Sequence, residues 1–423
     1  MKNVSLKSMV FTIVALIGCV FIIILICEFM TRMHEARYYK KMILESKKSI
    51  YTADPDIGFG FIPDATVDQD DFVVQFNADG FRDINHNLKK DKYRILAVGD
   101  SFVFGWRAKY EDTFLTRIER LYTQKIEIIK MGIPGNGIAK DLKIIKFKGL
   151  KYHPDLIIVN FYVGSDFMDD LAPESKVINN IQIGALPFDA FENIDGKLYP
   201  YSKSRLAAFV RWKCLRFSIF FRRGMDFFGH LLLDAERAVF NAVFKKFVSL
   251  KAAKHIEDNF SKRQKELDRL HIGLRERNQI SKYLRNEMVV FHKDYSDYLN
   301  KAVSDVFKRI KEMDEIARMN KAEFVLVILP SDIQVNSQLF ENAKIVLWLS
   351  DLDYDVLKPN KLLTDFCRKN NIKFIDAYPA LKQAFLEGQQ LYLPDYDRHW
   401  TAKGHEVVSL AVKKGLDNLN LIK

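Results

Sequence analysis

The chain has 423 residues, 48% of them hydrophobic and 28% charged, a composition that supports a large buried core and excludes a disordered protein. Four cysteines without a Cys-x-x-Cys spacing argue against a disulfide framework and against a structural zinc site. The net charge of +11 is concentrated, because residues 203–287 hold 20 Lys and Arg against nine Asp and Glu. The rest of the chain is therefore close to neutral.

Residues 9–27 are almost wholly apolar and carry no charge. At about 1.5 Å per residue, this run spans a bilayer core of about 30 Å. Glu28 and Phe29 follow it, in place of the small-residue cleavage site of a signal peptide. We therefore expect one uncleaved transmembrane anchor, with a buried core helix as the alternative. Basic residues are more frequent after the run than before it, which by itself favours a cytoplasmic domain.

Beyond the anchor, short apolar segments of strand length alternate with helical patterns. The expected strands are residues 94–98, 126–129, 155–163, 322–329 and 372–376. The expected helices are residues 113–122, 138–150, 362–369 and 402–416, with a long helix before residue 322. This alternation predicts an α/β fold with a doubly wound, flavodoxin-like parallel sheet of about five strands, covered by helices on both faces.

The expected organisation has five parts, which are the anchor, a juxtamembrane segment (28–51), two halves of one α/β domain (52–170 and 301–423) and a basic helical insertion between them (171–300). Within the insertion, cations and aromatic rings alternate over residues 211–233. This pattern fits a lid on the protein or a helix at the membrane surface. No nucleic-acid partner is predicted, because nothing resembles a nucleic-acid-binding fold. Residues 262–287 are so charged that a solvated helix is expected.

Loops with small and polar residues follow the first three expected strands, and another precedes the last helix. They are Gly99-Asp100-Ser101, residues 132–137, Gly164-Ser165-Asp166 and residues 395–401. Functional loops of an open parallel sheet lie at the carboxyl ends of its strands. We therefore expect these loops to form one site, with Ser101 at a strand-to-helix turn beside backbone N–H groups.

The residue types in these loops match nucleophilic catalysis. A serine becomes a nucleophile when a neighbouring base takes its proton, and a carboxylate orients that base. Ser101, His399 and Asp397 supply these three groups, and the last two are close enough in sequence to share one loop. The backbone N–H groups of Ser101 and Gly135 are then available to stabilise an oxyanion. No metal and no other cofactor is predicted.

Together the motifs resemble the conserved blocks of the SGNH (GDSL-type) esterases and acyltransferases. The matching residues are Gly99-Asp100-Ser101, Gly105, Gly135, Gly164-Ser165-Asp166 and Asp397-Arg398-His399-Trp400. Upstream, Asn77-Ala78-Asp79-Gly80-Phe81-Arg82 looks like the segment before the nucleophile in membrane-anchored members. The resemblance covers about residues 52–175 and 320–420, and its Asp-x-His-Trp spacing is similar to the branch with polysaccharide O-acetyltransferases.

The resemblance implies a role for each matching residue. Ser101 matches the nucleophile, His399 the general base and Asp397 its partner, while Gly135 matches an oxyanion-hole glycine. Ser165 stands where the family usually has asparagine. A serine hydroxyl donates a hydrogen bond but reaches less far, and the loss of one oxyanion donor costs about 10²–10³ in rate. Ser165 is therefore expected to assist the oxyanion hole less well than asparagine.

Structural alternatives exist for several of these residues. Serine is a favourable helix N-cap, so Ser101 has that alternative, and Asp397 or Thr401 is able to cap the last helix. His399 has the alternative of a structural loop histidine. The three carboxylates after the third strand are expected to be solvated or capping, without a metal; they are Asp166, Asp169 and Asp170.

The resulting functional expectation is a serine esterase or O-acyltransferase that acts on acyl esters, such as acetyl groups of a carbohydrate or cell-envelope substrate. The alternative is a catalytically degenerate domain that binds glycan or assists envelope assembly. Because the resembling anchored enzymes work in the cell envelope and long domains translocate regardless of flanking charge, we expect a single-pass protein with an extracytoplasmic domain.

Overall fold

The computed structural model describes residues 50–170, 284–347 and 354–422, apart from positions 70, 71, 124, 296, 395 and 396. It also describes four short strands between residues 176 and 200 and scattered positions within 15–33 and 265–280. Most of the predicted anchor (9–27) and juxtamembrane segment (28–51), and all of the basic segment 203–254, lie outside the described residues. Among the described residues, no helix combines the length and apolar character needed to cross a membrane.

The chain divides into two units, residues 1–48 with 201–264 and residues 49–200 with 265–423. The second unit contains a five-stranded sheet in the order β13-β12-β7-β5-β6, in which every neighbouring pair is parallel. The strands are β5 (Tyr93–Gly99), β6 (Ile126–Gly132), β7 (Leu156–Tyr162), β12 (Glu323–Leu329) and β13 (Lys373–Asp376). The predicted α/β fold with a doubly wound parallel sheet is confirmed.

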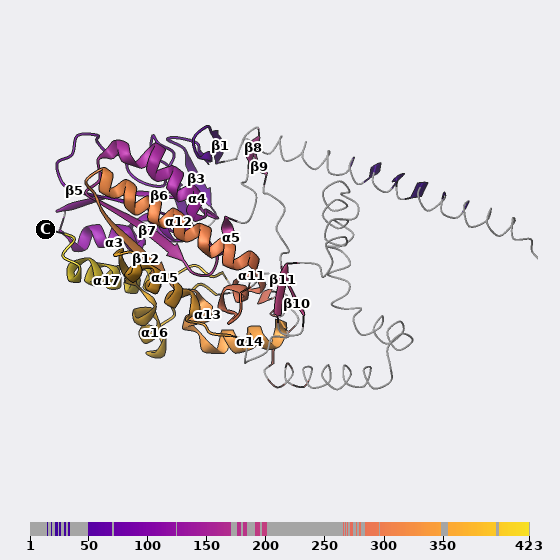
Figure 1. The fold of residues 1–423 in the computed structure, drawn as a ribbon. Helices are drawn as coiled ribbons and strands as arrows, with labels where there is room; N and C mark the ends of the chain where they lie inside the picture. The colour runs from indigo at the N-terminus through magenta and orange to yellow at the C-terminus, as the bar shows by residue number, and fades with distance from the viewer. Residues whose placement is uncertain are drawn as a thin grey trace, which may run out of the picture. The chain divides into compact units, whose positions relative to one another are not determined.

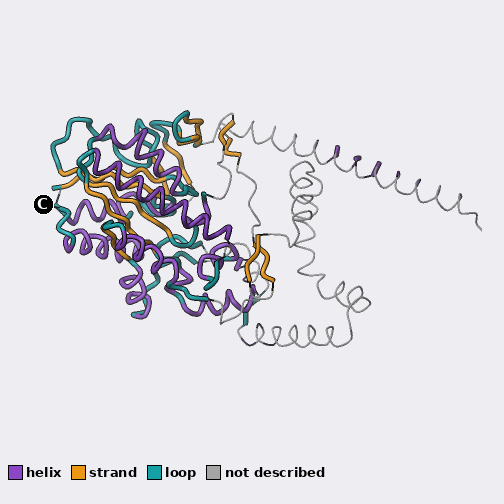
Figure 2. The backbone as a smooth tube through the Cα atoms, in the orientation of Figure 1, coloured by secondary structure: helices purple, strands orange, loops and turns teal. Residues whose placement is uncertain are grey.

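Helices cover both faces of this sheet, as Figures 1 and 2 show. On one face, α4 (Ile138–Ile144), α12 (Asp297–Met319) and α15 (Lys358–Lys369) pack in one core cluster. On the other, α3 (Phe114–Leu121), α16 (Tyr378–Leu386) and α17 (Ala402–Asn418) pack in a second cluster. The strands are buried on both faces, which explains their nearly continuous apolar sequences.

The strand order sets the place of the functional loops. Of the five strands in the sheet, β5 comes first along the chain, and it lies between β6 and β7, which come second and third. The chain therefore reverses its direction of winding between β5 and β7. Ligands of open α/β sheets bind outside the carboxyl ends of the strands at such a switch point. The loops that begin at Gly99 and at Val163 both start there.

Several elements are additional to those predicted. Two antiparallel hairpins precede the sheet, β1 (Tyr51–Asp54) with β2 (Gly58–Phe61) and β3 (Thr66–Gln69) with β4 (Phe72–Gln75). Two more lie in the first part of the insertion, which was expected to be helical: β8 (Lys176–Ile178) with β9 (Ile181–Ile183) and β10 (Phe191–Ile194) with β11 (Lys197–Pro200). The short helices α11 (Arg285–Met288) and α13 (Asp332–Val335) and the helix α14 (Ser337–Leu347) were also not predicted as separate helices.

A solvated helix was expected over residues 262–287. This expectation is wrong for the described positions of that stretch that are buried. Leu267, Ile280 and Leu284 are buried in the larger core cluster, and the side chain of Glu287 is also buried. These three apolar residues are spaced widely among charged ones. The high proportion of charged residues in this stretch therefore gave no sign in the sequence that part of it is buried.

Candidate active site

The turn after β5 fixes Ser101 at the switch point. Gly99 has φ +155°, and a Cβ there would meet Val103 Cγ2 at 2.7 Å and the Asn160 carbonyl oxygen at 3.0 Å, so only glycine fits. Asp100 is the N-cap of α2 (Ser101–Phe104), and its Oδ1 accepts the N–H of Phe102 at 2.9 Å. The helix is therefore capped by Asp100, and the capping alternative for Ser101 is wrong.

The structure brings Ser101, His399 and Asp397 into one hydrogen-bonded chain. His399 Nε2 lies 2.8 Å from Ser101 Oγ, and His399 Nδ1 lies 2.6 Å from Asp397 Oδ1. The backbone N–H of His399 also donates to Asp397 Oδ1, at 3.3 Å. The imidazole remains partly exposed and contacts the ring of Phe102, with ring centroids 5.3 Å apart. The imidazole is therefore packed against an aromatic ring while part of it stays exposed to solvent.

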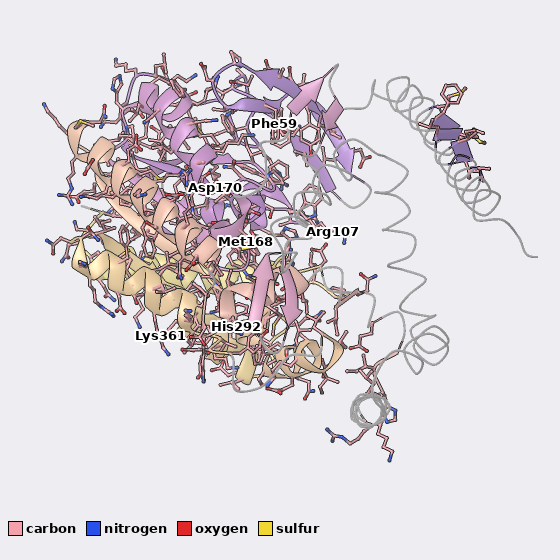
Figure 3. The ribbon with its side chains drawn as sticks, turned by 45° about the vertical axis from the view of Figure 1, so that its right-hand side comes forward. Phe59, Arg107, Met168, Asp170, His292 and Lys361 are labelled. Atoms are coloured by element: carbon pink, nitrogen blue, oxygen red, sulfur yellow. The ribbon has the colours of Figure 1, made fainter. Side chains whose placement is uncertain are left out.

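Hydrogen bonds from His399 and Arg107 to the two carboxylate oxygens of Asp397 favour its ionised form. Burial by itself raises the pKa of this carboxyl, but the hydrogen bond and charge of His399 and a hydrogen bond from Arg107 together lower the pKa to about 2. Arg107 Nη1 donates to Asp397 Oδ2 at 3.1 Å. Figure 3 labels Arg107 and Met168, the latter in the segment after β7. Nothing in the sequence motifs pointed to Arg107.

The loop that carries His399 is braced by a short antiparallel pairing. The N–H of Leu393 donates to the His399 carbonyl at 2.8 Å, and the N–H of Thr401 donates to the Leu391 carbonyl at 2.9 Å. Trp400 is fully buried and packs against Phe102, with centroids 4.4 Å apart. The hydroxyl of Thr401 accepts the N–H of Gly404 and caps α17, so the capping alternative for Asp397 is wrong.

Gly135 follows β6 in a tight turn. The N–H of Asn136 donates to the Ile133 carbonyl at 3.1 Å, and Gly135 has φ +71°, which with Pro134 before it is typical of a type II turn. Nothing lies within 4 Å of a Cβ built at Gly135, so the backbone conformation and not lack of space calls for glycine. This turn flanks the Ser101 loop, because β6 neighbours β5 in the sheet.

Ser165 lies in the loop after β7, on the other side of the Ser101 loop. Its hydroxyl donates to Asp169 Oδ2 at 2.8 Å. The Ser165 hydroxyl therefore points toward a carboxylate of the short helix that follows it, α5 (Asp166–Asp169). Gly135 and Ser165 thus lie on the loops that flank Ser101, whereas hydrogen bonds join Ser101, His399 and Asp397 directly.

Carboxylates lie at the base of these loops, and three of them were expected to be solvated or capping. The solvated alternative is wrong for Asp166, which is buried, while Asp169 and Asp170 are half-buried. Burial raises the pKa of Asp169 to about 6 and that of Asp100 to about 7. Asp166 is buried as well, and burial holds its pKa well above the usual range. Asp170 accepts the N–H of Ala139 near the start of α4, as its capping alternative predicted. Within the described part of the chain, no group of these residues is arranged to hold a metal ion.

An ion pair between half-buried Arg398 and buried Glu287 ties the His399 loop to the end of the insertion. Arg398, between Asp397 and His399, donates to Glu287 Oε2 at 3.0 Å. Glu287 Oε1 accepts the hydroxyl of Tyr162, the last residue of β7, at 2.6 Å. A Cβ at Gly164 would lie 1.9 Å from Glu287 Oε1, which explains the glycine there. Glu287 was not predicted, because it lies within a densely charged stretch.

Arg82 fixes the segment after Ser101 from the other side. Its guanidinium donates to the carbonyl oxygens of Phe104, Gly105 and Ala108, at 3.1, 2.5 and 2.7 Å. These carbonyls lie at the end of α2 and just beyond it, where a helix has no internal donors for them. The sequence pointed to Arg82 only as part of the segment that precedes the nucleophile.

No protein-family model matches the chain, and no curated protein matches its sequence. Solved structures with a similar arrangement share 10–12% identity with it. A variant of an acetyl-xylooligosaccharide esterase from Geobacillus has 10% identity and TM-score 0.35, over 80% of this chain and 99% of its own. A G-D-S-L family member from Veillonella parvula has 12% and 0.34, over 76% and 96%. A GDSL-like lipase from Bacteroides thetaiotaomicron has 10% and 0.31, over 77% and 89%. Such low likeness does not bear on activity, and the case for one rests on the geometry of the site.

Proposed function

We propose that the chain is an SGNH-type serine esterase or O-acyltransferase that cleaves or transfers acyl groups through an acyl-serine intermediate. The observation that carries this proposal is the chain of hydrogen bonds from Ser101 Oγ through His399 to Asp397, at 2.8 and 2.6 Å. These distances match the reach of a nucleophile to its base and of a base to its orienting carboxylate.

In the first half-reaction, Ser101 Oγ forms a bond to the ester carbonyl carbon while its proton passes to His399 Nε2. Asp397 accepts the Nδ1–H, which fixes the tautomer and stabilises the imidazolium. The N–H groups of Ser101 and Gly135 are placed on adjacent loops to stabilise the oxyanion of the tetrahedral intermediate. When that intermediate collapses, the bond to the alcohol breaks and His399 returns the proton to the leaving oxygen.

In the second half-reaction, an acceptor hydroxyl loses its proton to His399 and attacks the acyl carbon of Ser101. Water as acceptor gives an esterase, and a sugar hydroxyl gives an O-acyltransferase. In both cases Ser101 is released as its hydroxyl. We propose acetyl or similar acyl groups of a carbohydrate or envelope glycan as the substrate, in line with the Asp-x-His-Trp motif of Asp397 to Trp400.

A non-enzymatic role is the second candidate, and the geometry of Ser165 favours it. Its hydroxyl is occupied by Asp169, so the oxyanion hole of this conformation relies on backbone N–H groups. A domain with a weakened oxyanion hole is suited to bind a glycan or assist envelope assembly without turnover. The two candidates differ in whether Ser101 is activated.

We further propose that residues 9–27 anchor the protein in the cytoplasmic membrane with the α/β domain outside. The basic, aromatic segment of residues 211–254 is proposed to lie at the membrane surface near the anchor. The length and apolar character of the first run support the anchor, and the alternation of cations and rings supports the second placement. Protease accessibility of a C-terminal tag on spheroplasts tests the orientation: a tag protected until lysis would overturn it.

Labelling of the full-length protein with a fluorophosphonate tests the activity itself, because the probe reacts with activated serines only. We expect labelling of the wild type, and none in Ser101→Ala or His399→Ala. Ser304→Ala, which removes an exposed hydroxyl in the middle of α12, is the matched control and should label like the wild type. Folded but unlabelled wild-type protein would favour the non-enzymatic role. Acetate release with and without a sugar acceptor then separates esterase from transferase.

A further inference from the structure

A cavity of about 420 Å³ lies beside the loop that carries His399. One wall is the segment after α16, Gln389 to Leu393, and the opposite wall is the first half of α14. Asp332, at the start of α13, also lines it. None of these residues takes part in the acyl-transfer steps described above.

The polar groups of the cavity are mainly uncharged amides. Five of its lining side chains are of this type: Asn336, Gln338, Asn342, Gln389 and Gln390. The rings of Phe385 and Tyr392 also line it. Each amide both donates and accepts hydrogen bonds, so a set of them is complementary to a ligand with many hydroxyl groups. Aromatic rings beside such groups offer apolar faces to the C–H faces of a sugar ring.

Hydrogen-bonding capacity in the cavity is not used up within the described part of the protein. The Oε1 atom of Gln389 is buried and accepts no hydrogen bond there. An orphaned buried acceptor costs free energy until a donor reaches it. The acidic members of the lining are Asp332 and Glu276, and burial raises the pKa of Asp332 to about 7. The described lining residues include amides and carboxyls and neither Lys nor Arg, a composition that disfavours an anionic ligand.

The segment that forms one wall of the cavity is hydrogen-bonded to the loop that carries His399. Leu393, which lines it, donates its N–H to the His399 carbonyl at 2.8 Å, and Tyr392 forms a bridge with Trp400. Arg398 is near enough that its charge acts on Asp332, against the effect of burial. A chain-like ligand that presents an ester to Ser101 is therefore able to extend over the His399 loop into the cavity.

We propose that this amide-lined cavity is a binding subsite for uncharged sugar residues, remote from the residue whose ester bond meets Ser101. The inference deepens the proposed function and rests on it, because it assigns the substrate a polymeric or oligomeric neutral glycan. Gln389 and Asn342, from opposite walls, are the polar contacts that the proposal singles out.

The test compares the full-length wild type with the double variant Gln389→Leu/Asn342→Leu. For each protein, kcat/KM is measured on acetylated xylo- and manno-oligosaccharides and on phenyl acetate, which is too small to reach the cavity. We expect the kcat/KM for the oligosaccharides, divided by the kcat/KM for phenyl acetate, to fall about 10-fold or more in the double variant. The reason is that each lost hydrogen bond contributes about 1 kcal/mol. Gln383→Leu is the matched control, because Gln383 is exposed on α16, outside the cavity, and donates to Glu387 as Gln389 does. It should keep the wild-type ratio.

A second arm measures binding without turnover, so that failure of the subsite differs from failure of the proposed activity. Ser101→Ala is titrated with unacetylated xylohexaose and mannohexaose and with a hexagalacturonate of similar length. We expect a neutral hexasaccharide to bind more tightly than the anionic one, and to bind at least 10-fold more weakly once Gln389→Leu/Asn342→Leu is added. Equal binding with and without the cavity substitutions, preference for the anionic probe, or no binding of either neutral probe would overturn the subsite. Absence of phenyl acetate turnover in the wild type would instead count against the proposed activity alone.

Discussion

Arg107 donates a hydrogen bond from Nη1 to Asp397 Oδ2 at 3.1 Å, while Asp397 Oδ1 lies 2.6 Å from His399 Nδ1. The carboxylate that orients the base is thus held through both oxygens. Arg107 itself has φ +57°, a conformation that costs a non-glycine residue about 1–2 kcal/mol. The contact therefore combines a strained backbone position with a bond to the proposed catalytic group.

Replacement of Arg107 by glycine is predicted to lower activity without loss of stability. Arg107→Gly removes the bond to Asp397 and relieves the backbone strain, so we expect kcat/KM to fall about 10-fold while Tm stays equal or rises. Arg107→Lys keeps the charge beside Asp397 and should retain more activity than Arg107→Gly. Wild-type activity in Arg107→Gly would show that Arg107 does not act through Asp397.

Replacement of Ser165 by asparagine is predicted to keep or raise activity. The longer amide of Ser165→Asn is able to donate toward the oxyanion, whereas the native hydroxyl donates to Asp169 at 2.8 Å. A gained donor is worth up to about 10²-fold in kcat. Ser165→Ala serves as the control for loss of the hydroxyl alone. Esterase kinetics of the three proteins decide the matter, and a large loss in well-folded Ser165→Asn would assign the serine a specific role of its own.

Glu287 is predicted to be essential to stability although it lies outside the proposed triad. Its buried carboxylate pairs with Arg398 at 3.0 Å and accepts the Tyr162 hydroxyl at 2.6 Å. Glu287→Ala leaves the buried Tyr162 hydroxyl and the half-buried Arg398 without their acceptor, which costs about 1–3 kcal/mol, so the variant should be clearly destabilised in urea unfolding. The control is Asp365→Ala, which breaks an exposed pair with Arg368 and should change stability by less than about 1 kcal/mol. Equal effects of the two substitutions would contradict the buried role of Glu287.

The half-buried carboxylate of Asp169 is predicted to make stability depend on pH. Its pKa is raised from 3.8 to about 6 in the folded state, so the folded protein binds a proton there that the unfolded chain does not. This stabilising contribution is present at low pH and is lost as pH rises through about 6. Asp169→Asn, which is neutral at every pH, should therefore unfold at a higher temperature than the wild type at pH 8, by roughly 2–4 °C for each kcal/mol relieved.

The same comparison at pH 4.5 should show a smaller difference, because Asp169 is then protonated in the folded wild type. Thermal unfolding of both full-length proteins across this range measures the effect. Asp365→Asn, at an exposed carboxylate, should show no such trend. A stability gain in Asp169→Asn that is independent of pH would place its cause elsewhere than in ionisation.

The sheet was predictable because its signal is local. Each parallel strand is buried on both faces, so strands such as β7 are continuous apolar runs, and the expected residues 155–163 match Leu156–Tyr162 closely. The expected helix 138–150 is less regular: α4 ends at Ile144, a π-helical turn covers Ile145–Gly149, and a 3-10 turn follows. A Cβ at Gly149 would lie 2.3 Å from a methyl carbon of Leu96, so a close approach to β5 accompanies the change of helix type. That contact is not visible in the helical pattern.

The site was predictable only where motifs carry it. Ser101, Asp397 and His399 stand in recognisable blocks at strand ends, and strand order brings those blocks together. Arg107 and Asp397 lie 290 positions apart, and Glu287 and Arg398 lie 111 apart. Their pairing depends on how the loops pack in three dimensions. No periodicity or spacing in the sequence distinguishes Arg107 or Glu287 from ordinary surface charges.

The central claim is that Ser101 carries the acyl group, and trapping of that intermediate tests it most directly. The full-length protein is mixed with an activated acetyl ester, quenched in acid within the first turnovers, and its peptides are analysed by mass spectrometry. The account predicts one acetyl group on the peptide that contains Ser101, and none there in Ser101→Ala. It also predicts far slower accumulation in His399→Ala, which lacks the base. Turnover of the ester with no acetyl group on that peptide, or with the group on another side chain, would contradict the account.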